Sequence, residues 1–188
     1  MDDAKRLSDD LKYLGGLVKR SEGDSSPFAI YLLWALMVLV GFALVDFAPR
    51  RVGVFWSIGG PLGGVASAIL GYRHSLRVGQ LNREEGLRHL WHWGGMMVAI
   101  GLAVPLALAS VDWQALSRVI LLIVALSYFL AGVHLERPLR WIGALMMAGY
   151  VALFFLTRYG WTIVGILVAV GLIVSGLLEQ RRGAPAVR

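Results

Sequence analysis

Four histidines are the side chains of this chain best suited to acid–base or ligand chemistry. His92 and His134 lie at matching ends of two successive apolar segments, which are neighbours in sequence. Two imidazoles from two helices can hold a haem b, because haem iron accepts axial nitrogen ligands. His92 and His134 are therefore candidate haem ligands, and a haem b-binding electron-transfer subunit is one hypothesis for the function.

His89 and His92 suggest a second kind of site, since residues three apart share one face of a helix. Such a pair is able to contribute two ligands to a metal ion. No acidic third ligand is evident, although Glu84, Glu85 and Glu136 lie at similar depth. The ordinary alternative is that histidines at a membrane interface hydrogen-bond lipid head groups or water. We therefore assign no metal site from the sequence.

Enzymatic chemistry finds little support in the residue pattern. The absence of cysteine excludes disulfides, thiolate catalysis and Cys-ligated metals. Ser175 and Gly176 resemble a nucleophile motif, but no histidine lies at comparable depth. No phosphate-binding glycine loop or nucleotide motif is present. We therefore predict that the protein is not an enzyme. We also predict that it does not bind nucleic acid, because its basic residues lie between apolar runs.

Apolar helices must position these side chains. Of the 188 residues, 57% are hydrophobic and 16% are charged, with a mean hydropathy of +0.67, whereas soluble domains carry about 25% charged residues. A helix needs roughly 20 apolar residues to cross a bilayer. We predict an all-α polytopic membrane bundle over residues 25–180, with three antiparallel hairpins built from six spans at about 27–45, 52–72, 93–111, 119–135, 141–157 and 159–178.

The distribution of Lys and Arg predicts the orientation, because these residues accumulate in cytoplasmic connections. With the N-terminus inside, 14 of the 18 Lys and Arg residues fall on the inner side. The outer side holds Arg50, Arg51, Arg118 and Arg158. Both termini, including the tail at 181–188, are therefore predicted to be cytoplasmic. The overall pattern is similar to that of small inner-membrane proteins of proteobacteria, which implies the bacterial cytoplasmic membrane.

Glycines at four-residue spacing predict close helix packing in the second span. Gly59 and Gly63 lie on one ridge, and Gly60 and Gly64 lie on the adjacent ridge. Small residues let helix backbones approach, and lipid offers no hydrophobic drive for association. These four residues are candidate helix-packing positions. The pattern leaves open whether they meet a helix of the same chain or another subunit.

Ionisable residues are nearly absent from the span interiors, although they usually mark ion and proton pathways. Asp46, Asp112, Arg118 and Arg158 all lie near the predicted outer face. A proton-coupled transporter is therefore disfavoured. A small transporter or lipid-handling protein stays an alternative, and its distinguishing feature would be a continuous cavity lined by Ser, Tyr and Gly.

Residues 1–24 form a different kind of element from the spans. Apolar residues recur there at helical spacing among charged ones, at Leu7, Leu11, Leu14 and Val18. This pattern predicts an amphipathic cytoplasmic helix that contacts the membrane surface or a partner. The segment 73–93 adds a second basic stretch on the same side. We expect an accessory or regulatory subunit whose cytoplasmic face engages another protein or a second copy, with the bilayer as its other partner.

Overall fold

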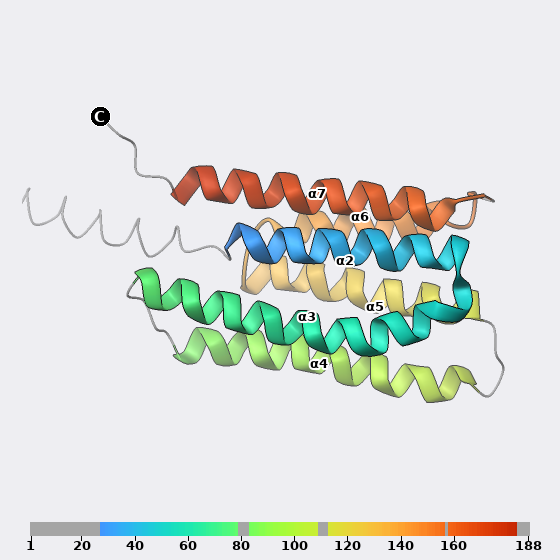
Figure 1. Ribbon diagram of the computed structural model, residues 1–188, viewed down its shortest axis with the longest axis horizontal. Helices are drawn as coiled ribbons and strands as arrows, with labels where there is room; N and C mark the ends of the chain where they lie inside the picture. The colour runs from blue at the N-terminus through green and yellow to red at the C-terminus, as the bar shows by residue number, and fades with distance from the viewer. Residues whose placement is uncertain (1–26, 79–82, 109–112, 157, 184–188) are drawn as a thin grey trace, which may run out of the picture.

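A computed structural model describes residues 27–78, 83–108, 113–156 and 158–183 as a bundle of helices lying along one axis (Figure 1). The helices are α2 (Phe28–Phe47), α3 (Pro49–Val78), α4 (Arg83–Leu108), α5 (Trp113–His134), α6 (Leu139–Ala152) and α7 (Gly160–Gly183). The described residues form no strand, so the predicted all-helical bundle is confirmed. The predicted helix over 1–24, with Leu7, Leu11, Leu14 and Val18, lies outside the described residues.

Four helices, α2, α3, α5 and α7, are long and apolar enough to cross a membrane, as expected of a membrane protein. Helix α6 is apolar but has 14 residues, or roughly 21 Å at 1.5 Å per residue. It ends at Ala152, whereas the sequence pattern extends this span to about residue 157. Helix α4 begins with a charged turn, Arg83–Arg88. Six spans therefore stay a prediction.

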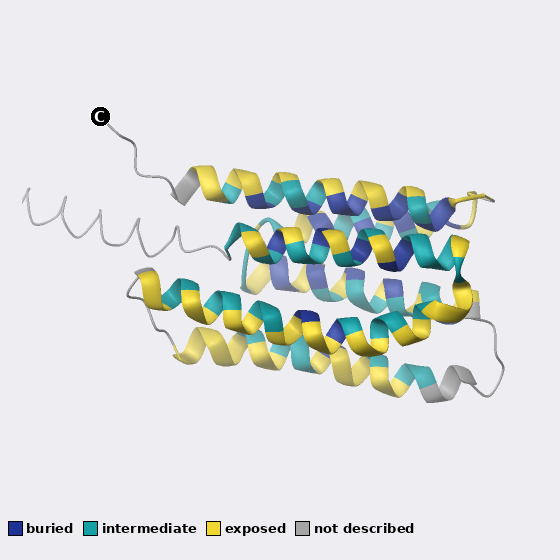
Figure 2. Ribbon diagram, viewed as in Figure 1, coloured by how far each residue is buried: buried dark blue, intermediate teal, exposed yellow. Residues whose placement is uncertain are grey.

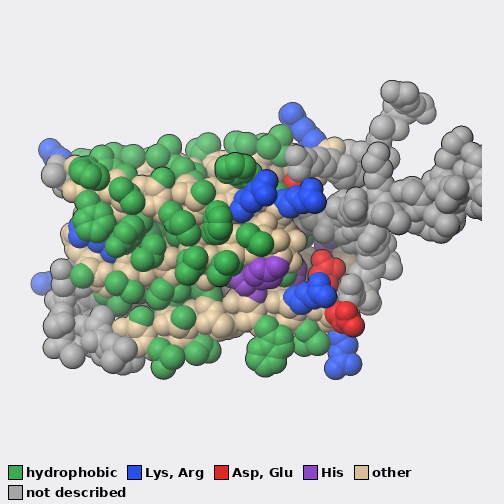
Figure 3. All heavy atoms as spheres, turned by 180° about the vertical axis from the view of Figure 1, so that it is seen from behind, with side chains coloured by type: hydrophobic (Ala, Val, Ile, Leu, Met, Phe, Trp, Pro, Cys, Tyr) green, Lys and Arg blue, Asp and Glu red, His purple; other side chains and the backbone are tan. Residues whose placement is uncertain are grey.

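The surface of the bundle separates apolar flanks from charged ends. Large hydrophobic side chains are exposed along every helix, among them Leu36, Ile58, Trp91, Phe129 and Leu167. Figure 3 shows hydrophobic side chains over one flank, with most charged side chains gathered towards the ends. We call the end at which α2 begins and α7 ends the inner end, after its predicted cytoplasmic location (Figure 1).

The hydrophobic core lies between α2, α5, α6 and α7 (Figure 2). Helix α2 packs most extensively on α7, and α5 packs most extensively on α6. Helices α3 and α4 flank this core, on α2 and α5 respectively. Among the described side chains of α4, Met96 is the single buried hydrophobic one. The core is centred on Ala35, Ala125, Ala131, Met146, Val168 and Leu172.

Glycines bring α5 and α6 into backbone contact. A Cβ atom on Gly143 would collide with the backbone of Phe129 and Ala125. A Cβ atom on Gly132 would collide with the backbone of Arg140. Because backbone atoms cannot move aside as flexible side chains do, these two glycines fix the spacing of the two helices. The turn between α5 and α6 is therefore held rigidly at the inner end.

The first predicted glycine ridge of α3 faces α2. A Cβ atom on Gly63 would lie 3.3 Å from the ring of Trp34, and one on Gly59 would lie 2.6 Å from the methyl carbon of Met37. The indole N–H of Trp34 donates a hydrogen bond to the Ser67 hydroxyl at 3.0 Å. This ridge therefore packs within the same chain.

The second predicted ridge, Gly60 and Gly64, is placed differently. A Cβ atom on either residue would meet no heavy atom of the described chain within 4 Å. The adjacent positions Leu62 and Val65 are exposed. The structure thus separates two ridges that have the same spacing in the sequence, and α2 covers only the first.

Candidate functional site

Three of the four histidines gather at the inner end, between α4 and the end of α5. His89 and His92 belong to the first turns of α4, and His134 is the last residue of α5. His74 belongs to α3. Figure 3 shows histidine side chains on the flank beside the charged end. The site consists of two hydrogen-bonded groups, one around Glu136 and one around His92.

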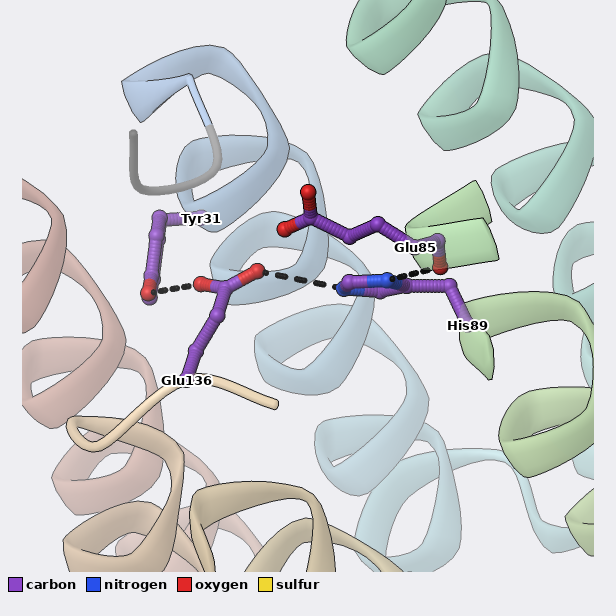
Figure 4. Close-up of polar contacts among 4 residues, drawn as sticks. All are labelled: Tyr31, Glu85, His89 and Glu136. Atoms are coloured by element: carbon purple, nitrogen blue, oxygen red, sulfur yellow. Dashed lines mark hydrogen bonds and ion pairs between the residues drawn. The ribbon is translucent and has the colours of Figure 1, made fainter. Parts of the chain in front are cut away.

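Glu136 connects two helices that are distant in sequence (Figure 4). Its Oε2 atom accepts a hydrogen bond from the Tyr31 hydroxyl of α2 at 2.9 Å. Its Oε1 atom lies 3.5 Å from Nε2 of His89 in α4. The Glu136 side chain is only 13% exposed, so it depends on these partners for the solvation that it loses. A single carboxylate therefore links α2, α4 and the α5–α6 turn.

The backbone of the α5–α6 turn determines where Glu136 lies. The N–H groups of Leu135 and Glu136 both donate to the Ala131 carbonyl, at 2.7 and 3.0 Å. The Glu136 carbonyl in turn accepts from the N–H of Leu139 at 3.0 Å, at the start of α6. Pro138 precedes this helix, where its missing N–H costs nothing. The turn thus holds the carboxylate between the two neighbouring helices.

Both ring nitrogens of His89 face acceptors, which favours the protonated imidazolium. Its Nδ1 atom lies 3.0 Å from the Glu85 carbonyl, and this oxygen can only accept. Its Nε2 atom faces the Glu136 carboxylate. The Glu136 carboxylate raises the pKa of His89 above the usual 6.5, although partial burial opposes the shift. The raised pKa favours the charged form of His89, which pairs with the Glu136 carboxylate.

His92 has the opposite character. Its Nε2 atom lies 2.9 Å from the Ser127 carbonyl, so Nε2 carries the hydrogen. The Nδ1 atom of the neutral ring is then an acceptor for Nε2–H of His134, at 3.1 Å. Burial lowers the pKa of His92 below 6.5 and the neighbouring histidines add to this, although the hydrogen bond to the Ser127 carbonyl opposes the shift. The lowered pKa favours a neutral His92 ring, and the two hydrogen bonds are compatible with that form.

The structure brings His92 and His134 together, but as a hydrogen-bonded pair. Their ring centroids are 4.8 Å apart at 65°. Axial ligation of one haem requires the iron to lie between two ring nitrogens. Here one nitrogen of His92 faces Ser127 and the other faces His134. This donor arrangement does not fit a haem held between the two residues.

The alternative of a metal ion held by His89 and His92 is not favoured either. The His89 ring turns to Glu136, and the His92 ring turns to Ser127 and His134. In the part of the chain that the structure describes, no group of three or more His, Asp or Glu side chains is placed to hold a metal ion. The histidines therefore act as hydrogen-bonding and charge-bearing groups between helices.

A hollow of about 170 Å³ lies at the surface of this site. The hollow is lined by charged residues of α4 and by the end of α5, at Glu84, Glu85, Arg88, His89, His134 and Leu135. Protons can exchange with the histidines there without crossing the core. Behind it, the Trp93 ring packs on the Tyr128 ring at 5.1 Å. We call the hydrogen-bonded cluster of Tyr31, His89, His92, His134 and Glu136 the polar joint. It lies beside an apolar contact between α4 and α5.

Sequence reasoning identified the histidines but missed Tyr31 and the role of Glu136. Tyr31 is 105 residues from Glu136 along the chain, and no local spacing signals a contact of that kind. The only sequence signal was the depth of Glu136, which matches that of the histidines. A scan against known protein families and searches of curated proteins and of solved structures found no match to this chain.

Proposed function

We propose that this chain is a non-enzymatic accessory or regulatory subunit of the bacterial cytoplasmic membrane, with six spans and both termini in the cytoplasm. The observation that carries the proposal is the construction of the inner end of α4. Its charged first turn is exposed, and the His89–Glu136 ion pair joins the next turn to the core. A partner that binds this turn acts on the contact between α4 and the rest of the bundle.

The charges at the inner end suit a protein partner. The first turns of α4 expose both signs, at Arg83, Glu84, Glu85 and Arg88. Helix α3, which precedes α4 through residues 79–82, exposes Arg73 and Arg77 near its end. Mixed charges select a partner with the complementary pattern and disfavour others. The amphipathic pattern of residues 1–24 offers a second contact on the same side.

Contacts inside the bundle support an accessory role over transport. Ser67 accepts the hydrogen bond of Trp34, and Tyr128 packs against Trp93. Gly143 lies against the backbone of Phe129. Such hydroxyl and glycine residues would line a transport path, yet here they serve helix packing. Among the described residues, Tyr31 and Tyr128 are the buried ones that carry a hydroxyl group, and no charged residue is buried.

The native mass of the complex tests the proposal. The full-length protein, Arg83→Glu/Arg88→Glu and a chain lacking residues 2–22 are each extracted from the native membrane in mild detergent. We expect a defined partner to co-purify with the full-length protein. Charge reversal should lower its recovery about tenfold, equivalent to roughly 1.4 kcal/mol. The truncation should also lower recovery.

The control is Arg50→Glu/Arg51→Glu, which reverses two exposed charges at the opposite end of the bundle. Its recovery of partner should stay within about twofold of the unmodified chain, because screened surface charges act only over roughly 10 Å. A lone chain or a homo-oligomer, with a mass unchanged by the inner-end variants, would contradict the accessory role.

A further inference from the structure

A second hollow at the inner end carries a site that the histidine network does not use. Its volume is about 330 Å³, and it lies between the start of α6 and the end of α7. Its lining combines two guanidinium groups and one carboxylate with apolar and hydroxyl side chains, at Arg137, Pro138, Arg140, Trp141, Ser175, Leu178 and Glu179. Glu136 is next to Arg137 in sequence, but its side chain is bonded to Tyr31 and His89 instead.

The charge of this hollow favours an anion. Arg137 and Arg140 are both exposed and lie three residues apart. Glu179 supplies one opposing carboxylate, so the lining has a net charge of +1. The N–H groups of Leu139 and Trp141 donate to the turn carbonyls of Glu136 and Pro138. Recognition of an anion therefore depends on the two guanidinium groups, which suit phosphate oxygens in particular.

Part of the lining of the hollow is apolar and exposed. Trp141 is 67% exposed and Leu178 is 50% exposed. The guanidinium carbon of Arg140 lies 5.2 Å from the centre of the Trp141 ring, a cation–π contact. Tryptophan and arginine with this division of polar and apolar surface are typical of the membrane–water interface. A free phosphate would use only the charged part of this site.

We propose that this hollow binds the headgroup of an anionic phospholipid in the leaflet that surrounds this end of the bundle. Arg137 and Arg140 hold the phosphate, while Trp141 and Leu178 contact the start of the acyl chains. Basic pockets between membrane helices on the cytoplasmic side bind such headgroups in general. The site requires only that the bundle lies in a membrane with this end at the interface. It does not depend on the accessory role, so the two proposals can fail separately.

Lipid retention by the full-length chain tests the site. The protein is delipidated in mild detergent and titrated with phosphatidylglycerol or phosphatidylcholine that carry the same acyl chains, and bound lipid is counted by native mass spectrometry. We expect phosphatidylglycerol to be retained about tenfold better, because only it carries a net negative charge. Arg137→Gln/Arg140→Gln should abolish the preference. Arg137→Lys/Arg140→Lys should retain part of it, since lysine keeps the charge but loses the two-point contact.

Two further comparisons keep the result independent of misfolding. Glu179→Gln removes the opposing charge and should strengthen phosphatidylglycerol binding about two- to fivefold. Arg50→Gln/Arg51→Gln removes the same charge at the outer end and should leave the preference unchanged. Equal retention by Arg137→Gln/Arg140→Gln and the unmodified chain would overturn the proposal. Full competition by glycerol phosphate would instead identify a free-anion site and overturn the lipid assignment.

Discussion

The carboxylate of Glu136 determines the charge of His89, because it is the main cause of the raised pKa of that imidazole. Glu136→Gln keeps the size of the side chain and removes the charge. We expect the pKa of His89 to fall, because partial burial is then opposed only by the weaker contributions of Glu85. A histidine NMR titration measures this directly. Glu84→Gln, five residues before His89 in α4, is the matched control, and an unchanged His89 pKa in Glu136→Gln would contradict the ion pair.

His89 and His92 make opposite contributions to stability as pH changes. The folded pKa of His89 is raised, so its contribution is complete below about 6.5 and is lost as pH rises through that folded pKa. The folded pKa of His92 is lowered, so its contribution is complete above about 6.5 and is lost as pH falls through that folded pKa. Together they predict greatest stability near pH 6.5.

Unfolding midpoints in a detergent titration, measured from pH 5 to pH 9, check this expectation. His89→Gln should flatten the alkaline decline, and His92→Gln should flatten the acidic decline. If neither variant changed the pH profile, the polar joint would not contribute measurably to the docking of α4.

The contact between α5 and α6 leaves no room for a larger side chain at Gly143. A Cβ atom on Gly143 meets the backbone of Phe129 and Ala125, so the two helices must separate to admit one. We expect Gly143→Val to destabilise the fold by at least about 1–3 kcal/mol, the usual cost of overpacking. Gly64→Val is the matched control, because no described atom lies within 4 Å of its Cβ. Equal midpoints for the two variants in a detergent unfolding titration would contradict this packing.

Sequence spacing predicted the helices well but not their partners. Apolar runs identify α2, α3, α5 and α7, because length and hydropathy are properties of a single segment. The spacing of Gly59 and Gly63 is the same as that of Gly60 and Gly64, yet α2 covers only the first pair. Gly143 belongs to no such ridge and makes a tighter contact. A periodic pattern marks where a close approach is possible, whereas the neighbour is decided by the whole packing.

The site shows the same division between local and distant information. The proximity of His92 and His134 follows from two successive helices with matching ends. The Tyr31–Glu136 bond depends instead on α2 lying next to α7 and on the shape of the α5–α6 turn. The role of His92 also differs from the predicted haem ligand, because each of its ring nitrogens already has a hydrogen-bond partner. The residue type alone suggested that the histidines are haem ligands, whereas their geometry indicates hydrogen bonds between helices.

The packing order of the bundle differs from the order of the chain. The first described helix, α2, and the last, α7, share the most extensive contact, while α3 and α4 lie outside the core (Figure 1). Because α2 packs mainly on α7, the core cannot form completely until α7 is in place. The two flanking helices are held by fewer contacts, so the inner end of α4 is the place where a partner can shift one helix at least cost.

Whether α4 and α6 cross the membrane is decided by the sides on which their ends lie. The chain has no cysteine, so each introduced cysteine is a unique label. Six spans predict that Gln114→Cys and Arg158→Cys react with a membrane-impermeant maleimide on intact cells, as Arg50→Cys should. Arg83→Cys and Arg137→Cys should react only after permeabilisation. Arg83 and Gln114 flank α4, and Arg137 and Arg158 flank α6. Protection of Gln114→Cys would place the end of α4 inside, and protection of Arg158→Cys would place the end of α6 inside. Either result would reduce the number of spans.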